Sequence, residues 1–433
     1  MPARFRLAFR ALRHRDLRLF FTGQAVSLVG TWMQQVAMAW LVYRLTGSAL
    51  LLGVISFASQ FPSFLMAPVA GALADRWSRY RMVVGAQLLA MTQATVLAVL
   101  VLTGVVAVWH LVVLAVVIGL VNGVDVPARQ SLMIRLIDDP DDLPNAIALN
   151  SSMFNAARLV GPALGGLLIG LLGEGPVFVV NAVSFFGVLG ALWMLRLPHE
   201  PTEPTSSVLG SVAEGLDYAL RAASIRDLLV VLSLISLIGI PYVVLFPVFA
   251  RDVLGGDART LGLLTSCAGL GSLIGALALA SRSTVLGLGR IIARSSALFG
   301  ASLIAFSLSR NVVLSCVLLV ATGLSMILVT ASINTVLQTI VREEMRGRVM
   351  SLYTMAFVGT TPVGGLVGGW VASRLGAPVA VALGGAGCLA VAAWMARRLP
   401  ELRRLIRPVY AERGILPTVA TGIQSASDIR PRA

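Results

Sequence analysis

Twelve long apolar stretches fill most of this sequence and restrict the folds open to it. A helix needs about 20 apolar residues to cross a bilayer, and its backbone groups must be bonded without water. The stretches cover residues 17–43, 49–73, 80–103, 107–129, 145–172, 176–195, 228–250, 260–281, 288–308, 312–338, 348–373 and 377–396. Only 12% of the residues are charged, 57% are hydrophobic and the mean hydropathy is +0.87, whereas a soluble domain carries about 25% charged residues. The pattern predicts an all-α integral membrane protein and excludes a soluble enzyme or nucleic-acid-binding protein.

The positions of the basic residues predict the topology. All 34 are arginine, against 20 acidic residues, and the net charge is +14. If both termini lie inside, 28 arginines fall in segments expected to be cytoplasmic, and Arg158 lies within a span. Five arginines fall in external loops: Arg44, Arg251, Arg259, Arg310 and Arg374. The positive-inside rule therefore predicts twelve spans with both termini cytoplasmic, and we expect the first apolar stretch to be a retained helix rather than a signal peptide.

The residue types present argue against cofactor chemistry. Without lysine the chain has neither the nucleotide-binding lysine of a Walker A motif nor a Schiff-base residue. Its cysteines and histidines are too scattered to predict a disulfide framework or a metal site. An integral membrane enzyme would need a buried catalytic constellation that this sequence lacks. We expect no enzyme activity, no cofactor and no nucleic-acid partner.

A polar segment near the midpoint divides the chain. Residues 197–207 read LPHEPTEPTSS, a composition typical of a linker. The following residues, 208–224, place apolar side chains at helical spacing and predict an interfacial helix. We therefore expect an N-terminal six-helix half (1–195), a cytoplasmic linker with an amphipathic helix (196–227), a C-terminal six-helix half (228–398) and a largely disordered tail (399–433).

Two weak internal repeats support the division into halves. GALA at 71–74 recurs at 275–278, and GPALGG at 161–166 has a counterpart in TPVGGLVGG at 361–369. Many transporters consist of two related halves that rock about a central site. The spacing of the repeats, about 200 residues, fits two pseudo-symmetric halves of six helices.

One motif resembles a known transporter signature. The segment GALADRWSRYRM (71–82) is similar to G-x-L-A-D-R-x-G-R-[RK] of the major facilitator superfamily, except that Ser78 replaces a glycine. The segments 22–53, NGVDVPARQS (122–131) and RGRVMSLY (346–353) resemble the bacterial drug and siderophore exporter branch, which includes enterobactin exporters and macrolide efflux proteins. The resemblance implies the twelve-helix major facilitator fold.

The resemblance also implies a gating latch at the cytoplasmic ends of the helices. Its residues would be Asp75, Arg76, Arg79 and Asp125, with Arg79 paired to Asp125. Gly71 would let helix 2 approach helix 11, where the glycines at 364, 365, 368 and 369 give small-xxx-small spacings. Alternatively, the charges of this motif only set topology.

Asp125 and Arg158 are the ionisable residues inside the apolar stretches that most need an explanation, because such residues are costly in a bilayer. Asp125 is a candidate for carrying the coupled proton, or it pairs with Arg79. Arg158 is expected to face an aqueous cavity. It either binds an anionic substrate group, pairs with a polar residue or bonds to backbone carbonyls.

Small residues in helices 5 and 11 are candidates for packing and hinge positions. They are Gly161, Pro162, Gly165, Pro362 and Gly365. GPALGG resembles the end of the antiporter motif of exporter families, although Ala157 departs from it. Close helix packing and a kink would explain these residues equally well.

In this family helices 1, 4, 7 and 10 surround the central cavity. This arrangement makes five further residues candidate substrate contacts: Gln35, Asn122, Tyr242, Asn334 and Gln338. Each of them would alternatively stabilise a neighbouring helix.

Together these features predict a secondary transporter that exports a small amphipathic drug or siderophore, by proton antiport and alternating access. The resemblance to bacterial exporters implies a bacterial inner membrane, and we expect a functional monomer in that lipid bilayer with a small-molecule substrate. Uptake, lipid translocation and a non-transporting receptor are the alternatives.

Overall fold

The computed structural model describes residues 9–74, 78–195, 208–282 and 284–415 of the 433-residue chain. These residues form helices and short connections, and twelve of the helical segments are long and apolar enough to cross a membrane. The all-α class and the twelve spans predicted from sequence are confirmed. Because the number of spans is even, the start of the first span and the end of the last lie at one side of the bundle. We call this the termini side, and the other the opposite side.

The first six spans form the N-terminal half. Its helices are α2 (Arg15–Thr46), α3 (Ala49–Ala74), α4 (Arg79–Leu102), α5 (Val108–Arg135), α6 (Leu143–Leu172) and α7 (Glu174–Trp193), with short turns η1 (Arg10–Arg13) and η2 (Pro140–Asp142). Glycines at positive φ end the helices or connect them at Gly47, Gly104 and Gly173.

The last six spans form the C-terminal half. The seventh span combines α9 (Ala223–Leu234), η3 (Ile235–Gly239), η4 (Ile240–Val243), α10 (Phe246–Val248) and η5 (Phe249–Val253). The others are α11 (Ala258–Ala280), α12 (Leu288–Leu308), α13 (Val312–Ile340), α14 (Glu343–Thr354) with η6 (Met355–Gly359) and α15 (Thr360–Leu375), and α16 (Ala377–Glu412).

Two spans depart from regular α-helix. Pro241 and Pro247 interrupt the seventh span, because a proline removes a backbone donor and clashes with the preceding turn. The eleventh span contains a π-helical turn at Met355–Gly359. Both irregular segments lie beside α15 or α3 at the contact between the halves, a location where irregular backbone is tolerated because neighbouring helices cover it.

Two helices extend past the boundaries expected from the sequence. The tail was expected to be largely disordered from residue 399, but α16 continues to Glu412. Leu402, Ile406 and Tyr410 recur every four residues and are buried, whereas the prolines and arginines between them obscure this stripe in the sequence. The part of the tail beyond 415 lies outside the described residues.

The linker also ends earlier than expected. Helix α9 begins at Ala223, and its first apolar side chains, Ile225 and Leu228, are buried. The amphipathic helix is present as α8 (Val208–Arg221), and Glu214 of α8 forms an ion pair with Arg348 of α14 at 2.5 Å. The linker helix is therefore held against the C-terminal half.

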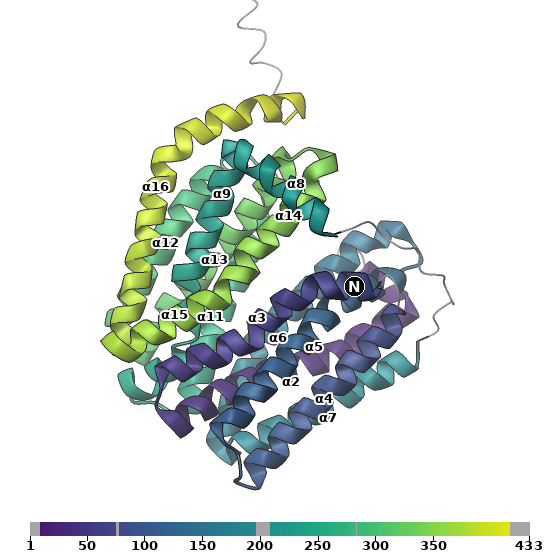
Figure 1. The fold of residues 1–433 in the computed structure, drawn as a ribbon, viewed down its shortest axis with the longest axis vertical. Helices are drawn as coiled ribbons and strands as arrows, with labels where there is room; N and C mark the ends of the chain where they lie inside the picture. The colour runs from purple at the N-terminus through teal and green to yellow at the C-terminus, as the bar shows by residue number, and fades with distance from the viewer. Residues whose placement is uncertain (1–8, 75–77, 196–207, 283, 416–433) are drawn as a thin grey trace, which may run out of the picture.

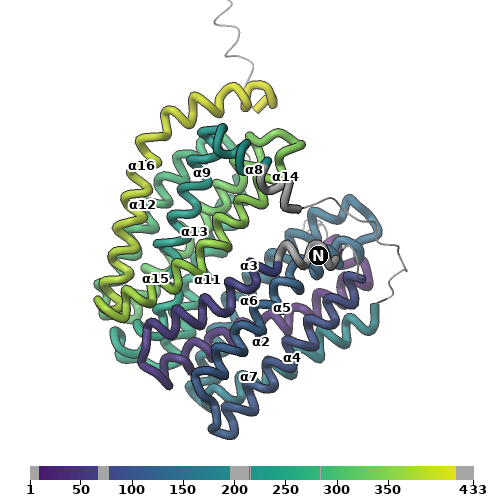
Figure 2. Tube along the Cα trace, viewed as in Figure 1, coloured from purple at the N-terminus to yellow at the C-terminus, as the bar shows by residue number. Residues whose placement is uncertain are grey.

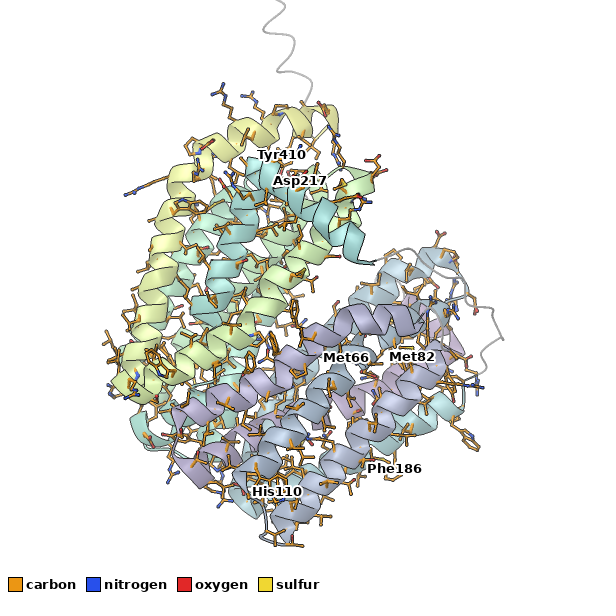
Figure 3. The ribbon with its side chains drawn as sticks, viewed as in Figure 1. Met66, Met82, His110, Phe186, Asp217 and Tyr410 are labelled. Carbon is orange, nitrogen blue, oxygen red and sulfur yellow. The ribbon has the colours of Figure 1, made fainter. Side chains whose placement is uncertain are left out.

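The two halves meet along two helix pairs. Helix α3 packs on α15, and α6 packs on α11. Figures 1 and 2 show the purple-to-blue N-terminal half and the teal-to-yellow C-terminal half in contact toward one end and diverging toward the end where α16 leaves the bundle. In Figure 3, His110 lies at the opposite side and Tyr410 at the termini side.

Candidate functional site

The contact between the halves is built from the glycine-rich repeats. A Cβ atom added to Gly53 of α3 would lie 2.8 Å from the carbonyl oxygen of Gly365, and one on Gly262 of α11 would lie 2.9 Å from the Cα atom of Gly166. These approaches admit no larger side chain. The repeated segments at 161–166 and 361–369 thus occupy corresponding positions across the interface.

The other predicted packing glycines face different helices. Gly161 lies against Trp32 of α2. A Cβ atom added to Gly165 would lie 3.0 Å from the Cα atom of Met33. Gly364 faces Leu237 and Gly368 faces Pro241, both in the seventh span. Pro162 and Pro362 are buried in α6 and α15. Small residues of α6 and α15 therefore make two sets of contacts for each helix, one within a half and one between halves.

Polar groups of both halves come together near the centre of the bundle. Arg158 of α6 interacts electrostatically with Tyr242 of the seventh span. The Tyr242 side chain is buried, and its hydroxyl has no hydrogen-bond partner in the part of the chain that the structure describes. Burying a hydroxyl without a hydrogen-bond partner costs free energy. A ligand bound beside Arg158 would supply that partner.

Aromatic rings surround this pair. The Arg158 guanidinium lies 5.9 Å from the ring centroid of Trp32, within the range of a cation–π interaction. Trp32 also meets Phe154 edge-on at 5.7 Å. On the other side, Tyr242 packs edge-on against Phe246 at 5.3 Å. The site combines a cation and a hydroxyl with flat apolar surfaces, which suits an amphipathic molecule that carries a hydrogen-bond acceptor.

A row of phenylalanines lines α3 where it faces η6. Phe57 stacks on Phe61 at 4.6 Å, and Phe61 lies 6.4 Å from Phe64. A Cβ atom added to Gly359 would lie 3.0 Å from the ring of Phe64. The row therefore extends an apolar surface along the contact between the halves.

The remaining predicted cavity residues are less closely associated. Gln35 and Gln338 are exposed, and Asn122 and Asn334 are half-buried. Gln338 donates a hydrogen bond to Asn334 at 2.6 Å, so these two residues bond to each other along one face of α13. Of the five, Tyr242 is the one that lies beside Arg158.

Asp125 is buried within the N-terminal half. Its carboxylate accepts a hydrogen bond from Gln87 Nε2 at 2.8 Å and lies 3.2 Å from Arg129 Nε. Among the described residues, these contacts replace the implied pairing with Arg79, whose Nε is buried without a hydrogen-bond partner there. Arg129 and Gln87 are thus the polar neighbours of the Asp125 carboxyl group.

The rest of the predicted latch cannot be placed. Asp75 and Arg76 lie outside the described residues. Gly71 belongs to α3, but its packing also lies outside them.

Hydrogen bonds join the halves toward the opposite side. Tyr43, near the end of α2, donates a hydrogen bond to the carboxylate of Asp252. Arg259 at the start of α11 donates to the carbonyl of Gly170 at 3.2 Å, and the Ser266 hydroxyl donates to the carbonyl of Leu159 at 2.7 Å. Nothing in the sequence distinguished Tyr43 or Asp252, because each lies near a helix end where polar residues are common.

A buried amide network inside the N-terminal half was also missed. Gln34 donates to Gln93 at 2.9 Å and accepts a hydrogen bond from Asn181 at 2.8 Å. This chain joins α2, α4 and α7. Gln34 and Asn181 stand out in the sequence as polar residues in apolar stretches, but their pairing depends on the fold.

Solved structures of low sequence identity share this fold. A peptide transporter of the POT family, PepTSo, has a TM-score of 0.69 at 15% identity, and the match covers 90% of this chain and 99% of that one. A bacterial homologue of the human lysosomal transporter Spinster has a TM-score of 0.64 at 16% identity, covering 92% of this chain and 98% of that one. These likenesses show that the chain shares the fold of these proteins.

The sequence profile of the transmembrane secretion effector family matches residues 7–408, and the chain therefore belongs to this family of the major facilitator superfamily. It is 24% identical over 353 residues to a staphyloferrin A transporter of Staphylococcus aureus, covering 81% of this chain and 88% of that protein. It is 27% identical over 356 residues to the multidrug efflux pump Tap of Mycolicibacterium fortuitum, covering 80% and 87%. Macrolide efflux protein A of Streptococcus pyogenes is 24% identical over 370 residues, covering 82% and 89%. These relatives match the drug and siderophore exporter branch.

Proposed function

We propose that this transporter exports a small amphipathic molecule with an anionic or strongly hydrogen-bond-accepting group, of the drug or siderophore class, in exchange for protons. The observation that carries the proposal is the electrostatic interaction between Arg158 of one half and Tyr242 of the other, whose hydroxyl has no hydrogen-bond partner among the described residues. One residue comes from each half, so a ligand held by both would sense their relative movement. The names of the relatives, which include efflux pumps and a siderophore transporter, support this substrate class.

The proposed orientation places both termini in the cytoplasm of a bacterium. Its support is the distribution of arginine, which gathers at the termini side in residues such as Arg10, Arg13, Arg290, Arg403 and Arg407. In that orientation the contacts Tyr43–Asp252 and Arg259–Gly170 close the external side. The conformation described here would then be the one that takes substrate from the cytoplasm.

Asp125 is the proposed site of proton coupling. Protonation would remove its attraction for Arg129 and change its bond with Gln87. Because α5 packs on α3 and α4, this change occurs beside a helix of the interface. The proposal thus links a proton to the movement of α3 without a metal ion or nucleotide.

The experiment measures transport into inverted membrane vesicles. In these vesicles export appears as accumulation, and an acidic interior supplies the gradient. The probes are amphipathic dyes, macrolides and a carboxylate siderophore, compared between the wild type, Asp125→Asn and a vesicle without the protein. We expect accumulation of at least one probe that requires the gradient and disappears in Asp125→Asn.

A matched control separates coupling from general damage. Asp227 of α9 is also buried and ion-paired, with Arg398 at 3.4 Å, but it lies away from the proposed coupling site. Asp227→Asn should keep gradient-dependent accumulation, provided that the variant is present at the wild-type amount. Probe accumulation in the wild type that does not depend on the gradient would contradict proton antiport. Probe accumulation only in right-side-out vesicles would indicate uptake instead.

A further inference from the structure

A pocket of about 300 Å³ lies in the C-terminal half, away from the site between the halves. Its walls come from the start of α12, the end of α13 and the part of α16 from Leu399 onward. The floor is apolar and buried, with Leu288, Ile292 and Leu402. We call this site the arginine pocket, because Arg290, Arg403 and Arg407 also line it.

Charge defines what the arginine pocket can bind. Arg290, Arg403 and Arg407 are exposed, and in the described part of the chain none of them forms an ion pair. No acidic residue lines the pocket. Arginine forms paired hydrogen bonds with phosphate oxygens. Three guanidinium groups above an apolar floor therefore match a phosphate group attached to a hydrocarbon.

The backbone reinforces this preference. Helix α12 begins at Leu288 without a side-chain cap, and its 21 residues direct the positive end of the helix dipole at the pocket. Gly287 precedes the helix at φ 84°, a conformation that favours glycine. Gly289 lines the pocket with no side chain, which leaves room above the floor.

Two other arginines fix the walls rather than face a ligand. Arg282 donates a hydrogen bond to the carbonyl of Leu286 at 3.0 Å, in the turn before α12. Arg413 donates to the carbonyl of Val341 at 2.8 Å, which ties the end of α16 to the end of α13. The pocket is thus formed by anchored elements and does not depend on a loose chain end.

We propose that the arginine pocket binds an anionic phospholipid, with the phosphate at the three arginines and the start of the acyl chains on the apolar floor. The pocket is at the termini side of the membrane, where α16 leaves the bundle as an amphipathic helix (Figure 1). Leu405, between the arginines of this helix, is exposed, as expected of a segment that lies on lipid. The binding site does not require the proposed export; only the identity of the leaflet depends on the proposed orientation.

The chain's own C-terminal residues do not match this pocket. Residues 416–433 contain Arg430 and Arg432 against a single acid, Asp428. A net positive segment would be repelled by the arginines. A lipid phosphate is also abundant at the place where the pocket opens, and anionic lipids attract basic residues near the surface.

The test is native mass spectrometry of the purified full-length protein with added lipid. We compare dioleoylphosphatidylglycerol, dioleoylphosphatidylcholine and glycerol 3-phosphate, which has the phosphate without the acyl chains. We expect retention of phosphatidylglycerol over phosphatidylcholine and no competition by glycerol 3-phosphate. Arg403→Gln and Arg407→Gln should each weaken binding about fivefold, the factor that corresponds to about 1 kcal/mol for each basic residue.

Two further variants keep the test decisive. Arg404→Gln removes an arginine of the same helix that does not line the pocket, and it should bind phosphatidylglycerol like the wild type. Gly289→Leu retains all charges but fills the floor, where its Cβ would lie 2.9 Å from Leu399 Cδ1, and it should lose phosphatidylglycerol. Equal retention of the two lipids, or equal losses in Arg403→Gln and Arg404→Gln, would overturn the proposal. Effective competition by glycerol 3-phosphate would assign the pocket to a soluble phosphate ester. None of these readouts depends on transport.

Discussion

Removing the buried hydroxyl of Tyr242 distinguishes a role in substrate binding from a role in packing. It has no hydrogen-bond partner among the described residues, so Tyr242→Phe removes no internal hydrogen bond. The phenylalanine ring would keep the edge-on contacts with Phe246 and Phe299. We expect the thermal stability of the purified protein to be unchanged or slightly higher, because the cost of burying an unpaired hydroxyl disappears.

Transport should respond differently to the same change. If the hydroxyl donates to the substrate, its loss removes about 0.5–1.5 kcal/mol of binding and raises the KM for transport about two- to tenfold. Thermal unfolding and vesicle transport, measured on one preparation, check both parts. A lower melting temperature with an unchanged KM would mean that Tyr242 is only a packing residue.

For single residues, the sequence identified candidate site residues better than the side chains that they contact. Arg158 and Asp125 could be chosen because ionisable residues in apolar stretches are rare. The sequence could not show that Asp125 contacts Gln87 and Arg129, because side chains from separate helices meet only in the folded bundle. Asp252 was missed for the same reason, since its partner lies on α2.

At the scale of helices, the glycine pairs set how closely the two halves can approach. Gly53 faces Gly365 so closely that even a methyl group must push α3 from α15. Gly53→Ala should therefore disfavour the conformation that is closed at the opposite side. Overpacking of this kind costs about 1–3 kcal/mol, a shift of about fivefold or more in the equilibrium.

Thiol labelling can measure this shift. Tyr43 is buried in the closed conformation, so a cysteine placed there reacts only when the opposite side opens. In a background without the native cysteines, Gly53→Ala should label faster at Tyr43→Cys. The matched control is Gly85→Ala in α4, where an added Cβ meets nothing within 4 Å. Equal labelling in both variants would argue against a role of the glycine contact in closure.

Sequence patterns predicted the number and class of the helices because hydropathy is a strong signal over 20 residues. They did not predict the irregular turns at Ile235–Gly239 and Met355–Gly359, which depend on neighbouring helices to cover the backbone. They also missed the extension of α16 to Glu412, since a buried stripe of one residue in four is weak beside Pro408.

For the whole molecule, the arrangement of the two halves is the one that the proposed transport by alternating access requires. The halves repeat the same pairing, with α3 on α15 and α6 on α11. Hydrogen bonds such as Tyr43–Asp252 hold them together toward the opposite side. Rocking about these pairs would separate Tyr43 from Asp252 and bring the termini sides together. Substrate held between Arg158 and Tyr242 would then be exposed at the other face.

Reversible cross-linking at the opposite side tests this account most directly. In a chain whose native cysteines are replaced, Tyr43→Cys and Asp252→Cys are joined by a short bifunctional thiosulfonate reagent, and transport of an accumulated probe is measured in vesicles. The account predicts that cross-linking abolishes transport, that reduction restores it, and that the reagent leaves each single-cysteine variant active. A cross-linked protein that transports at the rate of the reduced one would contradict alternating access through this site.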